Sequence, residues 1–263
     1  MNNYTEQFWT YTNVNSLKVA VSRQMKRLPP LFDVARRATR LLGDRTPVYD
    51  LLAKISDKLP GIGFIQIGSN DGISGDPLRE FIVASAKWHG AFVEPVPQIF
   101  EKLRQNYSHL RGRKFTFFNV AISAQPGTKQ FWRIKDACLH EFPLFASGIG
   151  SFDRGHIIKH FPILGNLDSK LEAIEVPCKT YQEIREQAGL REVHVLHLDV
   201  EGHEYHILRS IDFAYLKPLN ILFEISHMSD STKHEAFSML QSHGYRIQEF
   251  AIDCVATLPD RDL

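Results

Sequence analysis

The chain has 263 residues, 43% of them hydrophobic and 23% charged, and carries a net charge of +1 at pH 7. That length accommodates one large α/β domain with an extension, and the nearly neutral charge gives no overall attraction to nucleic acid or anionic membranes. No apolar run approaches the roughly 20 residues that span a bilayer. Three distant cysteines form no CxxC motif, and the polar, aromatic N-terminus is unlike a signal peptide. We therefore expect a cytoplasmic protein with reduced thiols, no transmembrane segment and no nucleic-acid partner.

Residues 1–58 predict a helical extension, broken at Pro29–Pro30 and again around Gly43 and Pro47. Residues 1–45 hold eight Lys or Arg against three acidic residues. A solvated helical face is one interpretation of this bias, and a surface that faces phosphate or a membrane is the other. The main domain is expected from residue 59 to residue 263.

From about Gly61 the sequence alternates between strand and helix patterns. We expect strands at 64–67, 90–93, 115–122, 193–198, 219–225, 245–251 and 254–258, and helices at 77–85, 97–107 and 232–243. Residues 129–134 are expected to form a hairpin with the third strand. Strands that alternate with helices indicate an α/β fold with a mostly parallel sheet covered on both faces.

The stretch from Cys138 to Glu175 does not follow this alternation and is rich in Gly, Phe and His. An insertion of this length in a compact domain is usually functional or disordered, and its aromatic content argues against disorder. We expect residues 138–175 to form a lid or substrate wall, in which Arg154, His156 and His160 contact a polar acceptor.

The most informative stretch is Phe64–Gly72, FIQIGSNDG, where an apolar strand ends in two glycines that frame Ser69, Asn70 and Asp71. A helix start follows at once, because Asp76 can cap a helix and Pro77 suits its first position. Strand, glycine turn and helix is the arrangement by which open α/β sheets bring backbone close to a ligand. The GxxxG spacing differs from the GxGxxG of dinucleotide dehydrogenases.

The strand ends expected around this cleft are unusually acidic. They offer the glycine turn, Glu94, Asn119, Asp199, Glu201, Glu224 and His227. An acidic rim suits a ligand with positive charge and hydroxyls, such as S-adenosylmethionine (SAM), and Glu94, 22 residues beyond Gly72, is placed to bind ribose. A diphosphate prefers bare N–H groups and positive charge, so Asp71 and Asp76 disfavour a nicotinamide cofactor.

Twelve histidines invite a metal hypothesis, but no HExxH or comparable ligand spacing occurs, and we predict no metal. One alternative stays open, in which Asp199, Glu201 and His203 of HLDVEGHEYH hold a divalent ion. The two acids are equally consistent with capping a helix that begins near Glu204.

In their order and separations, five segments resemble the FkbM family of SAM-dependent methyltransferases over about residues 61–230. They are FIQIGSNDG, FVEP, FNVAIS, LHLDVEGHEYHILRSI and ILFEISH. The resemblance implies the class I methyltransferase fold, a Rossmann-like seven-stranded sheet whose last strand is antiparallel. It also implies O-methyl transfer to hydroxyls of sugars, polyketides and other natural products, with S-adenosylhomocysteine as the cofactor product.

Carried over by position, the resemblance implies cofactor contacts residue by residue. The turn Gly68, Ser69, Asn70, Asp71 and Gly72 holds the methionine part, Glu94 with Pro95 lies at the ribose, Asn119 and Ala121 flank adenine, and Asp199 faces the methionine end and the substrate. The family commonly has an acid near the end of strand one, where this chain has Gln66. We expect Asp71, Asp76 or Asp199 to compensate.

Methyl transfer to an alcohol is assisted by a base that accepts the hydroxyl proton. The candidates are His227, Asp199 and Glu201, with Glu224 behind them, and His227 is equally consistent with capping or orienting a neighbour. Two other function classes stay open: a nicotinamide-dependent oxidoreductase, and a non-catalytic binding module with the same fold. The residues do not decide between a sugar, polyketide, lipid-headgroup or peptide acceptor, nor whether the chain forms a homo-oligomer.

Overall fold

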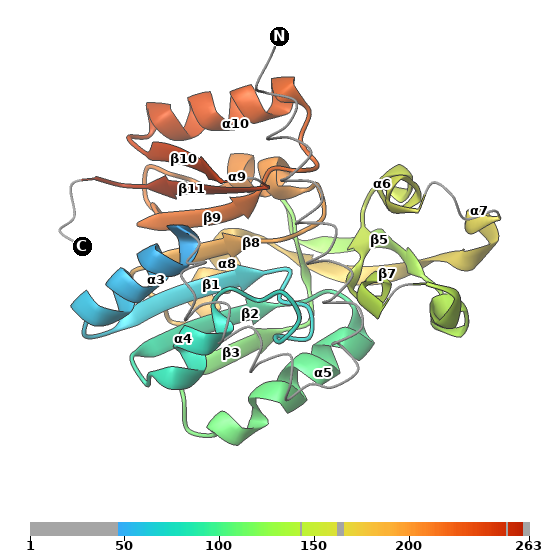
Figure 1. Cartoon of the computed structure of the whole chain (residues 1–263), viewed down its shortest axis with the longest axis horizontal. Coiled ribbons are helices and arrows are strands. Elements are labelled where there is room, and N and C mark those ends of the chain that lie inside the picture. Colours follow the sequence, from blue (N-terminus) through green and yellow to red (C-terminus); the bar gives the residue numbers. More distant parts are fainter. Residues whose placement is uncertain (1–46, 143, 162–165, 251, 260–263) are drawn as a thin grey trace, which may run out of the picture. The chain divides into compact units, whose positions relative to one another are not determined.

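The computed structural model describes residues 47–142, 144–161, 166–250 and 252–259 (Figure 1). The chain divides into two compact units, Met1–Pro47 and Val48–Leu263, and all described side chains belong to the second. The predicted extension falls largely on residues 1–46, outside the described residues, and stays a prediction. Helix α3 (Pro47–Lys58) belongs with the sheet, because its Leu52 and Ile55 are fully buried in the core.

A seven-stranded sheet forms the centre of the second unit, in the spatial order β10–β11–β9–β8–β1–β2–β3. Its strands are β1 (Ile62–Ile67), β2 (Trp88–Val93), β3 (Phe115–Phe118), β8 (Val195–Leu198), β9 (Asn220–Glu224), β10 (Arg246–Phe250) and β11 (Asp253–Thr257). Strands β3, β2, β1, β8 and β9 pair in parallel, and β11 is antiparallel to both of its neighbours. The predicted class I fold, with its antiparallel last strand, is confirmed.

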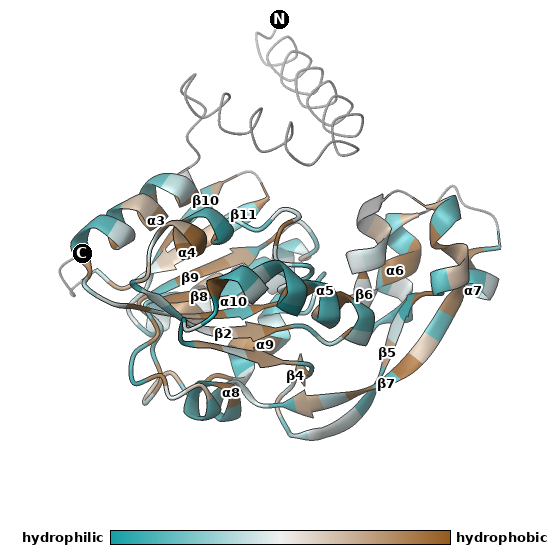
Figure 2. Cartoon of the chain, turned by 90° about the horizontal axis from the view of Figure 1, so that it is seen from below, coloured by the Kyte–Doolittle hydropathy of each residue, from teal (hydrophilic) through white to brown (hydrophobic). Residues whose placement is uncertain are grey.

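Helices cover both faces of this sheet, as predicted. They are α3, α4 (Arg79–Ala84), α5 (Pro97–Tyr107), α8 (Tyr181–Gln187), α9 (Glu204–Ser210) and α10 (Asp230–Ser242). Successive residues of a strand point to opposite faces, so Phe64 packs with α3, α4 and α5, whereas Ile65 packs with α8, α9 and α10. In Figure 2 hydrophobic colour is concentrated on the strands, whereas α5 is largely hydrophilic in colour.

Local sequence signals fix where two of these helices begin. α5 runs from Pro97 to Tyr107, as predicted, with proline in its first turn. α8 begins with a capping box, in which Thr180 Oγ1 accepts the N–H of Glu183 and the Glu183 carboxylate accepts the N–H of Thr180. Neither α8 nor the strand before it, β7 (Leu171–Lys179), was predicted.

The prediction of one continuous third strand at 115–122 is wrong. β3 stops at Phe118, and β4 (Ala121–Ile122) joins a second sheet. Asn119 lies at the break, where its side-chain amide donates to the carbonyl oxygens of Glu94 (2.9 Å) and Pro95 (3.0 Å). These hydrogen bonds hold the chain against the end of β2 while it leaves the main sheet.

The predicted hairpin between the third strand and residues 129–134 is also wrong. β5 (Gly127–Ile134) pairs antiparallel with β7 and with β6 (Gly150–Ser151), and β4 pairs in parallel with β7, so the second sheet has the order β4–β7–β5–β6. The physical reason is the number of residues that can pair. β5 forms eight residue pairs with β7, whereas β4 is only two residues long.

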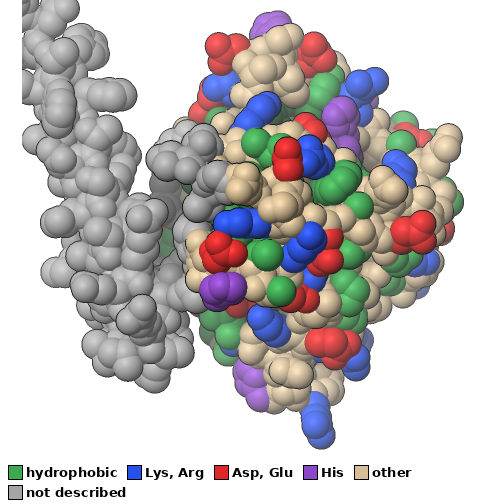
Figure 3. Space-filling view, turned by 90° about the vertical axis from the view of Figure 1, so that its right-hand side faces the viewer, with side chains coloured by type: hydrophobic (Ala, Val, Ile, Leu, Met, Phe, Trp, Pro, Cys, Tyr) green, Lys and Arg blue, Asp and Glu red, His purple; other side chains and the backbone are tan. Residues whose placement is uncertain are grey.

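The described residues of 127–142, 144–161 and 166–179 form an arm beside the main sheet (Figure 1). Besides its strands, the arm contains η2 (Asp136–Glu141), η3 (Leu144–Gly148), α6 (Arg154–His160) and α7 (Leu167–Lys170). It has its own hydrophobic cluster around Phe142, Ile157 and Phe161. Figure 3 shows acidic and basic side chains interspersed over this side of the molecule. Among the described helices, none has the length and apolar character needed to cross a membrane.

Candidate active site

The glycine turn after β1 joins the ends of three strands. The N–H groups of Gly68 and Ser69 both donate to the carbonyl of Val93 at the end of β2, each over 3.0 Å. Ser69 Oγ donates to the carbonyl of Gln66 and accepts the N–H of Val93. Gly68 has a φ of +77°, and a Cβ there would lie 1.8 Å from the carbonyl oxygen of Asp199 at the end of β8. The turn therefore requires glycine for its conformation and for the close approach of β8.

Glu94 is buried at the end of β2, and each of its carboxylate oxygens accepts one backbone N–H group. Oε2 accepts from Asn70 (3.0 Å), which has a left-handed φ of +48°, and Oε1 accepts from Val96 (2.9 Å). Burial raises the pKa of Glu94 to about 7, although these two hydrogen bonds act to lower it. Each oxygen keeps a further lone pair, so the carboxylate can still accept hydrogen bonds from ligand hydroxyls.

Gln66 and Asp76 form a buried hydrogen-bonded pair behind the turn. Gln66 Nε2 donates to Asp76 Oδ1 (3.0 Å) and lies 3.4 Å from His197 Nδ1. The same Asp76 oxygen accepts the N–H groups of Leu78 (2.8 Å) and Arg79 (3.2 Å), but α4 begins at Arg79 and not at Pro77 as predicted. Burial raises the pKa of Asp76. Gln66 Oε1 is buried and has no hydrogen-bond partner among the described residues. A buried acceptor without a partner, beside a cleft, fits a ligand that brings a hydrogen-bond donor.

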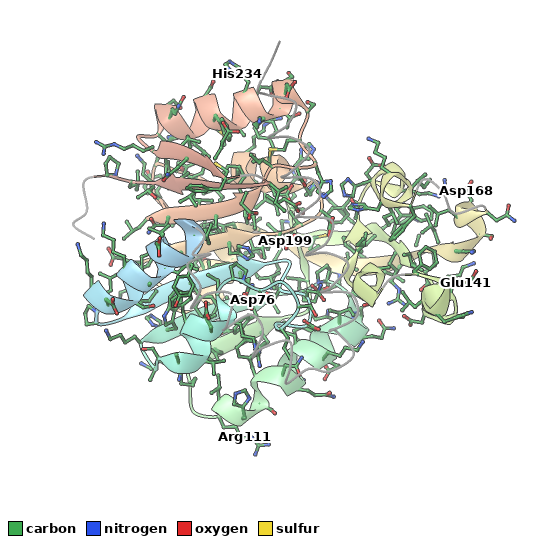
Figure 4. All side chains as sticks on the ribbon, viewed as in Figure 1. Asp76, Arg111, Glu141, Asp168, Asp199 and His234 are labelled. Atoms are coloured by element: carbon green, nitrogen blue, oxygen red, sulfur yellow. The ribbon has the colours of Figure 1, made fainter. Side chains whose placement is uncertain are left out.

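A cleft opens at these strand ends, with about 530 Å³ of empty space in one part and about 420 Å³ in the adjoining part. Most of the predicted cofactor-binding residues line it: Gln66, Gly68, Ser69, Asn70, Asp76, Glu94, Pro95, Ala121 and Asp199. In Figure 4, Asp76 and Asp199 lie near the centre of the view, whereas Glu141 and Asp168 lie out on the arm. The sequence prediction and the cavity thus coincide at the end of β1, β2 and β8.

Three predicted residues shape this cleft from behind instead of lining it. Asp71 Oδ1 accepts the N–H groups of Ile73 (2.9 Å) and Ser74 (2.8 Å), so its carboxylate stabilises its own turn. Gly72, with a φ of +69°, packs against α5. Asn119 holds the end of β2 through the two carbonyls described above.

The arm supplies the wall opposite the strand ends. Phe131 of β5 and the segment Gly148–Phe152, which belongs to the predicted insertion, line the same cleft as Glu94 and Asp199. Gly148 lies directly against the Asn70 side chain, where a Cβ would come within 2.2 Å of Nδ2. The insertion therefore forms part of the cleft, whereas closure of a lid stays a prediction.

Asp199 follows β8 and stands where this cleft meets a neighbouring pocket, which is lined by Leu222, Phe223 and Glu224 of β9 and by Asp253 of β11. Protein surrounds the carboxyl on most sides. This burial, and after it the charges of Glu201 and Glu224, raise the pKa of Asp199 to about 8. The residue is still open to solvent, so a ligand in the cleft can reach it.

Glu201, two residues further on, lies among three histidines. Its Oε2 is 3.1 Å from Nε2 of His160, 3.4 Å from Nε2 of His227 and 3.7 Å from Nε2 of His156. Burial raises the pKa of Glu201, but the imidazoles of His156 and His160 outweigh it and lower the pKa to about 2. The structure thus joins two predicted base candidates, Glu201 and His227, to two histidines of the arm.

The sequence analysis named all four of these residues without predicting that they meet. The HxxxH spacing of His156 and His160, which places both on one face of a helix, was the available signal. His203, which the open metal alternative used, is not in this group: its ring lies 5.1 Å from that of Phe152 and 4.6 Å from that of His206.

The strand order, the glycine turn and the acidic strand-end cleft define a class I methyltransferase fold. The family model described as "Methyltransferase FkbM domain" matches residues 66–247, more than half of the chain. The chain therefore belongs to the FkbM family of SAM-dependent methyltransferases, which confirms the resemblance inferred from its motifs.

Solved structures with a similar fold are distant in sequence. A precorrin-6y C5,15-methyltransferase from Geobacter metallireducens is 12% identical, with a TM-score of 0.40 and coverage of 81% of this chain and 89% of that one. A SAM-dependent O-methyltransferase from Thermotoga maritima is 13% identical (TM-score 0.41; 85% and 71%), and an rRNA methylase from Streptococcus thermophilus is 11% identical (0.41; 81% and 95%). At this distance they say nothing of the acceptor. Among curated proteins none matches the chain.

Proposed function

We propose that this chain is an O-methyltransferase that uses SAM and acts on a hydroxyl of a sugar, glycan or other natural product. The observation that carries the proposal is the buried carboxylate of Glu94 at the end of β2, beside a glycine turn and opposite Asp199. Such a cleft offers hydrogen-bond acceptors to a ligand that has hydroxyls and positive charge.

The residues present fit this cofactor. Glu94 has a free lone pair on each oxygen for the ribose hydroxyls, and Val120, Ala121 and Ile122 give an apolar wall for adenine. Gln66 Oε1, the buried acceptor without a partner, lies in the part of the cleft nearest the glycine turn and suits the amino group of the methionine part. Asp76, hydrogen-bonded to Gln66, places a carboxyl group beside this acceptor.

The cofactor supplies an activated methyl group on a positively charged sulfur. The contribution of the chain is to hold the acceptor oxygen in line with that methyl group and to take up its proton. Of the three predicted bases, Glu201 and His227 already face each other and the arm histidines. Asp199 remains open in the cleft, and we assign it the contact with the acceptor hydroxyl.

The arm supports a hydroxyl-bearing ring as the acceptor class. Phe131 and Phe152 present aromatic surface to the cleft, while Ser151, Glu201 and His203 present polar groups there. A mixture of flat apolar and polar surface suits a saccharide or a polyketide ring, which has both C–H faces and hydroxyls. A cytoplasmic location and the absence of a nucleic-acid partner stay predictions, and the oligomeric state stays open.

Two measurements test the proposal. Calorimetric titration of the purified chain with S-adenosylhomocysteine and, separately, with NAD and NADP distinguishes a methyltransferase from an oxidoreductase. Transfer of label from methyl-labelled SAM to a panel of saccharides and polyketides, with Glu94→Ala as the inactive control, then distinguishes an enzyme from a binding module. Binding of a nicotinamide cofactor in preference to S-adenosylhomocysteine rules the proposal out.

A further inference from the structure

Four potential metal ligands converge where the arm meets the main sheet. His156 and His160 come from α6, Glu201 from the loop after β8, and His227 from the segment after β9. One ligand atom from each lies within 4.8 Å of all the others. These residues are separated by up to 71 positions in the sequence, so only the packing of the arm brings them together.

Four of the six distances between these ligand atoms, from 2.9 to 3.7 Å, bracket those of a tetrahedral site, and all six stay within 4.8 Å. Four ligands at about 2.0–2.2 Å from a central Zn²⁺ lie about 3.3–3.5 Å from one another. Glu201 Oε2 lies 3.1, 3.4 and 3.7 Å from the three imidazole nitrogens, and Nε2 of His156 lies 2.9 Å from Nε2 of His160. In each case the facing atom of the histidine is the same ring nitrogen, Nε2.

The hydrogen bonding at this point is incomplete. Glu201 Oε2 is buried, and among the described residues it receives no hydrogen bond of acceptable geometry, although three ring nitrogens surround it. A carboxylate oxygen and neutral imidazole nitrogens all present lone pairs, which a shared cation satisfies together.

The backbone at Glu201 and Gly202 has an unusual conformation that lets the four side chains meet. Glu201 has a φ of +54°, in the left-handed region that non-glycine residues seldom adopt. Gly202 follows with a φ of +91°, and a Cβ there would lie 2.8 Å from Cε1 of His156. Strain held at one point of a fold is a marker of function, and here it places the carboxylate of Glu201 among the histidines.

The charges nearby also favour a cation. Nε2 of His227 lies 3.5 Å from Glu224 Oε1 and 3.4 Å from Glu201 Oε2, so two carboxylates flank this imidazole. Gathering carboxylates at a partly buried point is unfavourable without positive charge. One divalent ion bound here would offset two of these negative charges.

We propose that His156, His160, Glu201 and His227 bind one divalent transition-metal ion of the zinc type, which fastens α6 of the arm to the strand ends. Three nitrogen ligands and one oxygen ligand select Zn²⁺ and its first-row neighbours, whereas Mg²⁺ and Ca²⁺ prefer oxygen alone. Because Glu201 also lines the cleft, the ion lies at the junction of the arm and the cleft. This site does not depend on the proposed cofactor.

The direct test is calorimetric titration of ZnCl₂ into the full chain, without an affinity tag and after removal of metals with a chelator. We expect one Zn²⁺ per chain and no binding of Mg²⁺. His160→Gln and Glu201→Gln should each weaken Zn²⁺ binding by more than the roughly 10- to 100-fold that loss of a ligand's supporting partner causes. His206→Gln is the matched control, because His206 is an α9 histidine outside the cluster, and it should leave the affinity unchanged.

A second measurement tests whether the metal ion stabilises α6 of the arm. Hydrogen exchange of the amides in Arg154–His160 should slow when Zn²⁺ is added to the wild-type chain and should not change in His160→Gln. Absence of saturable Zn²⁺ binding, or an equal loss in His206→Gln, overturns the proposal. Titration of the same metal-free protein with S-adenosylhomocysteine keeps the two proposals separate, because failure of one ligand to bind leaves the result for the other intact.

Discussion

The two halves of the cleft are built in different ways. The half beside Glu94 consists of consecutive strand ends of the main sheet, joined by backbone hydrogen bonds between the glycine turn and Val93. The half beside Glu201 consists of side chains from the arm and from two separate loops, joined through ring nitrogens and one carboxylate. Backbone hydrogen bonds hold the first half in place. The second half is held only by contacts between the carboxylate of Glu201 and the three imidazole rings.

This difference assigns separate tasks to the two halves. A site fixed by the backbone suits the cofactor, whose shape does not change from one enzyme to another. A site closed by an arm can differ between proteins with the same sheet, because loops and insertions vary more than the elements they connect. Changes in the two halves should therefore separate cofactor binding from acceptor turnover, and the predictions below follow from that separation.

The largest effect is expected from Asp199→Asn. The amide keeps the shape of the side chain but cannot accept the acceptor's proton, so kcat should fall by about 10²–10⁴-fold. Affinity for S-adenosylhomocysteine, measured by calorimetry on the same variant, should change much less than kcat. An equal loss in both quantities would place Asp199 with the cofactor alone.

Gly68→Ala should damage the fold itself. A Cβ at this position would overlap the carbonyl oxygen of Asp199 at 1.8 Å and is also disfavoured by the φ of +77°. Gly75→Ala is the matched control, because its φ is +75° and nothing lies within 4 Å of its added Cβ. In urea denaturation, the control should lose about 1–2 kcal/mol of unfolding free energy, and Gly68→Ala at least about 2 kcal/mol more. Equal losses would show that the close approach of β8 is unimportant.

Glu94→Gln should weaken S-adenosylhomocysteine binding by about 10- to 100-fold at pH 8, since hydrogen bonds from the ribose to a charged acceptor are lost. In the free protein, burial raises the pKa of Glu94 to about 7, so part of the population is protonated below that pH. Ribose hydroxyls favour the ionised form. Affinity of the wild-type chain should thus rise between about pH 6 and pH 8, and this rise should disappear in Glu94→Gln. A wild-type affinity independent of pH would remove Glu94 from the ribose site.

Arg154→Ala should have the smallest effect, although the sequence suggested that Arg154 contacts the acceptor. Its guanidinium pairs with Asp168 and lies 5.4 Å from the centre of the Trp132 ring, so it is engaged within the arm. The ion pair lies at the surface, with 37% of the Arg154 side chain and 72% of the Asp168 side chain exposed, so the loss should stay below about 1 kcal/mol of unfolding free energy. The KM for an acceptor should not change, and a large rise in KM would restore Arg154 to the acceptor site.

The sequence was sufficient to predict the part of the main domain whose structure depends on a few neighbouring residues. The glycine turn, the acid at the end of β2 and α5 each depend on a few neighbouring residues, and the motif order indicated the family. The arm was mispredicted because its ladder joins β5 to β7, about 40 residues apart, through pairing that no local pattern encodes. The histidine cluster was missed for the same reason: its members lie in three segments that only the folded arm brings together.

The central claim is that the strand-end cleft binds SAM through Glu94 and the glycine turn. Calorimetric titration of S-adenosylhomocysteine into the folded chain at pH 8, in parallel with Glu94→Ala, tests it most directly. We expect saturable binding to one site with a Kd in the micromolar range, as is usual for enzyme ligands, and markedly weaker binding in the variant. No binding at millimolar ligand by a chain that circular dichroism shows to be folded, or equal affinity in Glu94→Ala, would contradict the claim.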